Sequence, residues 1–349
     1  MTHRRLGTIA LVLALALAGG CGDDGGLDPN DPDNPNALGL AVGVRVDPAT
    51  FPTTGEFILE LVPSTAQGQS LVTEAWETTA GLGAPAAVVA TLLSQELSTP
   101  DTRPFSVALD IDNTGSMSRN DPDAQRLDAA GMFAQAFIPQ TAGNRLSLFE
   151  IGPTTTTVPP ETPGFPGSRF VTDWTASAAA IEAAAGALSA YPDAVGGSRI
   201  YRSIEEITDW IDSTTSAVDE RRAIIVLTDG RPSDEDLREG VFANALAAQV
   251  RVYTVGIGPG SDRGGDTDPV AVQELQLIAN RTGGLYVGAA TPERISALLE
   301  AFATSTSQGV ILARFRLDPI PAPGLTVSGT VRMENDRGVA QAPWSFVAP

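Results

Sequence analysis

The feature that most constrains this chain is the stretch at residues 105–118, an apolar run that passes directly into a loop of oxygen-bearing side chains. Its first half, FSVALDI, is typical of a strand buried inside a sheet. Asp112, Thr114 and Ser116 follow at a spacing of two, and an intervening glycine permits the sharp turn that lets them converge. A carboxylate with two hydroxyls is an oxygen-only ligand set, suited to Mg²⁺, Mn²⁺ or Ca²⁺ and poorly suited to zinc. The pattern D-x-T-x-S is weak evidence by itself and depends on support from elsewhere in the chain.

Residues 104–308 alternate strand-like apolar segments with amphipathic helix-like segments. This order predicts an α/β fold, a doubly wound and mostly parallel sheet covered by helices on both faces. Ligands of such sheets bind at the carboxyl ends of the strands. Asp112 and Asp229 both end expected strands, and Ser198 follows two glycines at the start of an expected helix. We therefore expect the two carboxylates at one edge of the sheet, with Ser198 able to reach the same point.

The segments on either side of this region, 38–103 and 309–349, alternate apolar and polar residues in short runs separated by proline and glycine. Such patterns indicate β-strands. The expected strands are 38–46, 56–62, 70–78 and 86–93 on the amino-terminal side, and 310–319, 325–335 and 342–348 on the carboxyl-terminal side. Either both segments pair into one β region into which the central domain is inserted, or they form two independent small β extensions.

The amino-terminal residues 1–20 have a short basic start and an apolar run that is too short for a comfortable membrane span. They fit a secretory signal. The small residues before Cys21 resemble a bacterial lipobox, which implies a lipoprotein signal peptide and lipidation of Cys21; an ordinary signal peptide is the alternative. Residues 21–37 are rich in Asp, Gly, Pro and Asn, and we interpret them as an acidic tether. The chain is therefore expected in the bacterial cell envelope, anchored to the inner or the outer membrane.

Composition excludes several kinds of chemistry. The formal net charge of −20 argues against a nucleic-acid partner, because an acidic protein repels phosphates. The chain has no lysine, one histidine and one cysteine, and both His3 and Cys21 lie near the amino terminus. Once the signal is removed, no imidazole remains for Ser-His-Asp or Cys-His catalysis and no cysteine pair for a disulfide or a zinc finger.

Three stretches, DNTGSM at 112–117, GGS at 196–198 and TDG at 228–230, occur in an order that resembles the metal-ion-dependent adhesion site of von Willebrand factor A-type (vWA) domains. The similarity extends over roughly residues 105–305. It implies a vWA domain with Thr114, Ser116 and Ser198 binding a metal through their hydroxyl groups, and the lipobox-like residues place this domain in a bacterial lipoprotein. It also implies that Asp112 and Asp229 bind the metal directly or through water. Asp110 departs from the family pattern, since that strand position is usually apolar.

The resemblance implies a function in binding rather than in catalysis. Mg²⁺, or else Mn²⁺ or Ca²⁺, would keep one coordination position for an acidic side chain of a protein partner. The expected protein is thus a lipid-anchored envelope protein that captures such a partner, and not an enzyme.

Two other functions stay open at this point. Asp110 and Asp112 also match the D-x-D-x-T motif of haloacid-dehalogenase-like phosphatases, in which they would be the nucleophile and the general acid/base beside Mg²⁺. That chemistry usually needs a lysine, which this chain lacks. The other alternative is a structural envelope protein whose metal site has no partner. The sequence assigns no role to the long loop at 154–167 and does not identify the partner.

Overall fold

The computed structural model describes residues 38–65, 67–85, 87–151, 167–188, 197–262, 266–289 and 294–349. The expected signal peptide, Cys21 and the tether lie outside the described residues, as does the loop at 154–166. Within the described part of the chain, no helix combines the length and apolarity that a membrane crossing requires.

Thirteen strands are found among the described residues. They are β1 (Gly39–Arg45), β2 (Glu56–Ser64), β3 (Glu77–Ala84), β4 (Val89–Leu97), β5 (Phe105–Asp112), β6 (Arg145–Ile151), β7 (Ser168–Thr175), β8 (Arg221–Thr228), β9 (Val250–Ile257), β10 (Tyr286–Ala289), β11 (Ile311–Asp318), β12 (Thr326–Asn335) and β13 (Gly338–Val347). The α-helices are α1 (Phe51–Thr54), α2 (Met117–Asn120), α3 (Gln125–Phe137), α4 (Ala178–Gly186), α5 (Ile200–Thr214), α6 (Arg238–Ala247), α7 (Pro269–Thr282) and α8 (Arg294–Gln308).

Ten strands form one sheet in the order β4-β11-β2-β1-β10-β9-β8-β5-β6-β7. Strands β10, β9, β8, β5 and β6 are mutually parallel, and β7 is an antiparallel edge strand. Helices α3, α4 and α8 pack on one face of this parallel part, and α5, α6 and α7 pack on the other. The α/β fold with a mostly parallel, doubly wound sheet is therefore confirmed.

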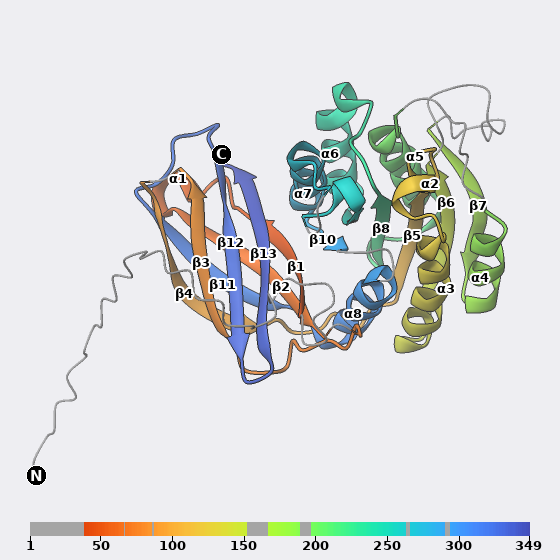
Figure 1. Ribbon diagram of the computed structural model, residues 1–349, viewed down its shortest axis with the longest axis horizontal. Helices are drawn as coiled ribbons and strands as arrows, with labels where there is room; N and C mark the ends of the chain where they lie inside the picture. Colours follow the sequence, from red (N-terminus) through yellow and green to blue (C-terminus); the bar gives the residue numbers. More distant parts are fainter. Residues whose placement is uncertain are drawn as a thin grey trace, which may run out of the picture.

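The two flanking segments meet in space, as Figure 1 shows by the orange and blue strands that lie side by side. Strand β11 pairs with both β2 and β4, and β12 pairs with β3 in a second sheet of order β13-β12-β3. Aromatic rings fill the space between these sheets: Phe57 lies 5.6 Å from Phe315, 5.0 Å from Trp344 and 5.3 Å from Phe346, measured between ring centroids. The domain boundaries themselves stay predictions.

One expected strand is wrong. Of the segment 70–78, residues 71–76 form turns and irregular structure, and β3 begins only at Glu77. The apolar residues of this segment, Leu71, Val72 and Trp76, are nevertheless buried, although they do not belong to a strand. Only Ser70 and Leu71, at the start of the segment, pair with β2, and the indole nitrogen of Trp76 then donates to the Leu71 carbonyl (3.0 Å) within the segment itself.

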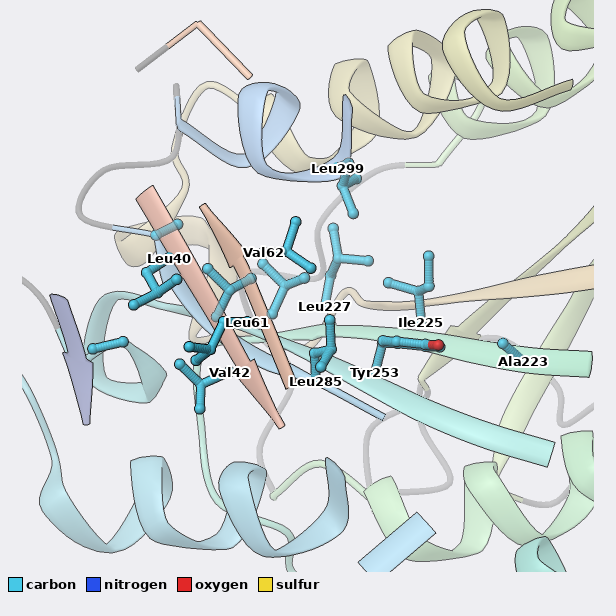
Figure 2. Close-up of a cluster of buried hydrophobic side chains, with 14 of the residues drawn as sticks. Leu40, Val42, Leu61, Val62, Ala223, Ile225, Leu227, Tyr253, Leu285 and Leu299 are labelled. Atoms are coloured by element: carbon cyan, nitrogen blue, oxygen red, sulfur yellow. The ribbon is translucent and has the colours of Figure 1, made fainter. Parts of the chain in front are cut away.

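The flanking strands continue directly from the parallel sheet. Strand β1 joins β10 in antiparallel pairing, with Val42 opposite Tyr286. Figure 2 shows side chains of β1 and β2, such as Leu40 and Leu61, in one apolar cluster with Ile225 of β8 and Leu299 of α8. Burial of apolar surface therefore links the flanking strands to the central region.

Gly284, just before β10, allows the chain to approach the neighbouring strand β9 closely. A Cβ atom at this position would lie 2.0 Å from the carbonyl oxygen of Val252, which belongs to the fixed backbone of β9. We expect Gly284→Ala to lower the free energy of unfolding by about 1–3 kcal/mol, measured by urea denaturation.

The matched control is Gly240→Ala in α6, where an added Cβ would meet no atom within 4 Å. It should instead raise stability by about 0.5–1 kcal/mol, because alanine favours a helix more than glycine does. Equal effects of the two substitutions would contradict the assigned packing.

Candidate metal centre

The carboxylate of Asp112, the last residue of β5, accepts hydrogen bonds from three separate chain segments. Its Oδ1 accepts from the backbone nitrogen (3.0 Å) and the hydroxyl (2.7 Å) of Thr114. Its Oδ2 accepts from the hydroxyls of Ser198 (2.7 Å) and Thr228 (2.6 Å). Asp112 is fully buried, so its charge is stabilised by these donors rather than by water. The parallel sheet brings the segments together because β5 and β8 are neighbours and end at the same edge.

The second carboxylate, that of Asp229, directly follows β8. Its Oδ1 accepts from the Ser116 hydroxyl (2.9 Å), and its Oδ2 accepts from the side-chain amide of Asn120 (2.6 Å). The Thr114 hydroxyl lies 3.3 Å from the hydroxyls of both Ser116 and Ser198. The structure thus brings all five residues of the expected ligand set within one continuous hydrogen-bonded cluster.

The loop that carries Ser198 is held by the loop that follows Asp229. The Ser198 carbonyl accepts from the backbone nitrogen (2.9 Å) and the hydroxyl (3.0 Å) of Ser233. Gly197 is required here, because a Cβ atom would lie 2.6 Å from the Cβ of Ser233. Asp234 then accepts from two backbone nitrogens in the first turn of α5, those of Tyr201 (3.2 Å) and Arg202 (2.7 Å). These bonds fix the position of the Ser198 hydroxyl.

The cluster has an excess of negative charge. Burial, and then the charge of Asp112, raise the pKa of Asp229 to about 6. The donors around the two carboxylates are neutral hydroxyl, amide and backbone groups, which bring no compensating charge. Two carboxylates and three hydroxyls are the oxygen donors that a hard divalent cation prefers. The residues present therefore fit a bound Mg²⁺, Mn²⁺ or Ca²⁺.

The cluster differs from metal sites that consist mainly of carboxylate or imidazole ligands, because three of its five side chains carry hydroxyl groups. No group of three or more His, Cys, Asp or Glu side chains that could hold a metal is found in the part of the chain that the structure describes. A cation here would depend on hydroxyl groups for most of its protein ligands. Only Ser116 of the five is half-buried rather than buried, so this side of the cluster faces the solvent.

Asp110 lies outside the cluster. Its side chain is fully buried, its Oδ2 accepts from the Ser203 hydroxyl of α5 (2.8 Å), and its Oδ1 has no hydrogen-bond partner among the described residues. Burial raises the pKa of Asp110 to about 8. A phosphatase nucleophile must reach a substrate, and a side chain with no exposed surface cannot. The geometry therefore argues against the phosphatase mechanism.

Four residues that support the site were not among the sequence-based candidates: Thr228, Asn120, Asp121 and Arg126. Thr228 could have been identified from the TDG stretch, since a hydroxyl beside Asp229 ends the same strand. Arg126 carried no such signal, because an arginine early in an expected amphipathic helix is normally exposed.

Arg126 holds the backbone of the loop that follows β5. Its side chain is fully buried and pairs with Asp121 (2.7 Å), which is also fully buried. Its Nε donates to the Asp112 carbonyl (3.0 Å), and Nη2 donates to the side-chain oxygen of Asn113. Asp121 also accepts from the backbone nitrogens of Gln125 (2.8 Å) and Arg126 (3.1 Å), at the start of α3. The loop is therefore held by an ion pair that does not contact the side chains of the candidate ligands.

We expect Arg126→Met to destabilise the protein by about 3–5 kcal/mol, because it leaves Asp121 buried without its cation. Chemical denaturation in chelator measures this loss independently of metal. Arg119→Ala, an exposed arginine of α2 in the same loop, is the control and should change stability by less than about 0.5 kcal/mol. A small loss in Arg126→Met would show that the pair does not hold the loop.

Glu206 of α5 gives a pH dependence that can be tested. Burial raises its pKa from 4.5 to about 7, although its carboxylate accepts from the backbone nitrogen of Gly167 (3.0 Å). A raised carboxyl pKa contributes stability below pH 4.5 that is lost as the pH rises to about 7. The stability of Glu206→Gln relative to the wild-type protein should therefore increase between these pH values and stay constant above them. Thermal unfolding in chelator provides the test, and a pH-independent difference would contradict the raised pKa.

Comparisons with known proteins give one sequence match and several weak structural ones. The family model of the von Willebrand factor type A domain matches residues 107–231, a range that contains all five candidate ligands. No curated protein sequence was found to match this chain.

Solved structures with some similarity include the pilus adhesin SpaC from Lactobacillus rhamnosus GG in its open conformation, at 14% identity and a TM-score of 0.44 over 90% of this chain and 47% of that one. Proximal thread matrix protein 1 from the mussel byssus, with a zinc-occupied MIDAS motif, has 12% identity and a TM-score of 0.40 over 66% of this chain and 50% of that one. The N-terminal domain of TFIIH p34 has 11% identity and a TM-score of 0.40 over 59% of this chain and 98% of that one. The chain thus spans about half the length of the first two proteins.

The sequence match, the parallel sheet and the order of the three loops agree with one another. Residues 107–231, which contain β6, β7, β8 and most of β5, are therefore similar to a von Willebrand factor type A domain.

Proposed function

We propose that this protein binds a partner protein through a divalent cation held by Asp112, Thr114, Ser116, Ser198 and Asp229. The observation that carries the proposal is the meeting of five oxygen-bearing side chains from three loops, linked by contacts of 2.7–3.3 Å. A cluster with two buried carboxylates and no cationic side chain among their hydrogen-bond partners would gain stability from a cation.

The chemistry of the ligand set favours Mg²⁺, with Mn²⁺ or Ca²⁺ as the other candidates. When bound, the ion would act as the positive charge to which an acidic group of the partner is attracted. Thr114 and Ser198 would hold it through hydroxyls that are already oriented by Asp112, and Asp229 would keep the Ser116 hydroxyl in place. The half-buried position of Ser116 places the solvent-facing side of the cluster where a partner could approach.

The cellular setting is part of the same proposal. A lipidated Cys21 and the tether at 21–37 would hold the described domains near a membrane of the bacterial cell envelope, facing other envelope proteins. Several acyl chains anchor a protein stably where one does not. The net charge of −20 would keep nucleic acids away, and local attraction of an acidic partner would therefore depend on the bound cation.

The first test is metal binding itself. Mg²⁺ should raise the melting temperature of the wild-type protein, because a ligand that binds only the folded state stabilises it. Asp112→Ala and Asp229→Ala should abolish this shift while circular dichroism stays native. Asp236→Asn is the control: it removes an exposed carboxylate shortly after the site loop and should keep the shift. A shift of the same size in all variants would remove these residues from the metal site.

Partner capture is then measured with the same proteins, by pull-down from envelope extract with and without chelator. A partner that is retained by wild-type protein and Asp236→Asn, and lost in chelator and in both alanine variants, supports the proposal. Partner capture that is unchanged in chelator and in both alanine variants would contradict the proposal. Metal binding without any chelator-sensitive partner would instead favour a structural envelope protein.

A further inference from the structure

A second charged site lies at the opposite edge of the parallel sheet from the candidate metal centre. A cavity of about 500 Å³ opens at the amino-terminal ends of β5, β8 and β9, and Arg45 of β1 and Glu60 of β2 also line it. Phe105, Arg221 and Val250, at the starts of the three central strands, all line it. This volume is in the range of cavities that bind small molecules.

The wall of this cavity carries more positive than negative groups, in a protein with a net charge of −20. Five guanidinium groups line it, those of Arg45, Arg103, Arg221, Arg222 and Arg251. Among the described residues of the wall, the carboxylates are those of Glu60, Asp101 and Glu220. Arginines in an acidic chain are thus gathered from four separate segments around one space.

The three carboxylates are already engaged. Glu60 pairs with Arg45, and Asp101 pairs with Arg103 at 2.7 Å. Glu220 pairs at 2.9 Å with Arg145, whose side chain is not part of the cavity wall. The three carboxylates of the wall therefore do not neutralise the charges of Arg221, Arg222 and Arg251.

The remaining arginines of the wall contact groups from several elements. Arg222 is 5% exposed and binds Asp212 at 2.8 Å, but its Nε has no hydrogen-bond partner among the described residues. Arg221 donates from Nε to the Arg103 carbonyl (3.2 Å), and its guanidinium lies over the ring of Phe105, 4.5 Å from the centroid. Arg251 lies beside the hydroxyl of Tyr253.

The electrostatic surroundings of Arg221 point in the same direction. Burial is the main cause that lowers its pKa, and the nearby cations Arg103 and Arg251 lower it further, against the opposing charge of Asp101. An arginine whose charged form is disfavoured by its surroundings would be stabilised by an added anion.

We propose that this cavity binds a small anion with two or more negative charges, either a phosphate compound or a polycarboxylate. The planar fork of each guanidinium matches the oxygens of both kinds of group, and several forks converge here. Arg45 belongs to the flanking strands, whereas Arg221 and Arg251 belong to the parallel sheet. A bound anion would therefore connect the two parts of the molecule and raise the stability of the whole chain.

The test is thermal unfolding of the full chain with pyrophosphate and, separately, with citrate. Sodium chloride at the same ionic strength is the reference, and chelator throughout keeps the metal centre out of the measurement. We expect at least one anion to raise the melting temperature of the wild-type protein. The larger of the two shifts identifies phosphate or carboxylate chemistry.

Substitutions then locate the effect. Arg221→Gln with Arg251→Gln should abolish the shift, whereas the control pair Arg281→Gln with Arg332→Gln, which removes two exposed guanidiniums, should keep it. If the cavity variant does not fold, calorimetry of Arg251→Gln alone should show about tenfold weaker binding of the effective anion. No shift in the wild-type protein with either anion, or the same shift in cavity and control variants, would overturn the proposal.

Discussion

The buried carboxylate of Asp112 is the interaction on which the rest of the site depends. It accepts hydroxyl hydrogen bonds from Thr114 in its own loop, from Ser198 before α5 and from Thr228 at the end of β8. Each of these segments is separated from the others in the chain, and the parallel sheet brings them to one edge. The carboxyl ends of parallel strands lie close together in any such sheet, and here the hydrogen bonds to Asp112 orient the hydroxyl groups of the three segments.

This arrangement has an electrostatic cost that the surrounding structure only partly offsets. Asp229 lies near Asp112 and its pKa is raised to about 6, chiefly by burial. The nearest buried cation, Arg126, is paired with Asp121 and holds backbone and amide groups of the loop rather than the two carboxylates. Arg126 and Asp121 thus hold the loop without neutralising the carboxylates of Asp112 and Asp229. In the proposed metal site, that separation of roles would keep the loop in place while its carboxylates attract a cation.

Much of this could be predicted from the sequence. The apolar run before Asp112 and the alternation at 104–308 predicted the fold class, because buried parallel strands have a distinctive composition. The family resemblance named Thr114, Ser116, Ser198 and Asp229, and the structure places them together; their role as metal ligands stays a prediction.

Other features depend on long-range pairing that a local pattern does not encode. The insertion of β11 between β2 and β4 joins residues more than 200 positions apart. The burial of Arg126 requires Asp121 and the Asp112 carbonyl to be in place, which no periodicity reveals. The segment at 71–76 alternates like a strand but closes through the Trp76–Leu71 hydrogen bond.

The strands β5 and β8 begin at the arginine-lined cavity and end at the acidic cluster, so groups of opposite charge lie at the two ends of these strands. The central claim concerns the acidic end, where the three loops are proposed to hold one cation. The most direct measurement is the anomalous diffraction of crystals grown with Mn²⁺. The account predicts one strong peak within coordination distance of the Ser116 and Thr114 hydroxyls. The absence of a peak there at saturating Mn²⁺, or a peak elsewhere only, would contradict it.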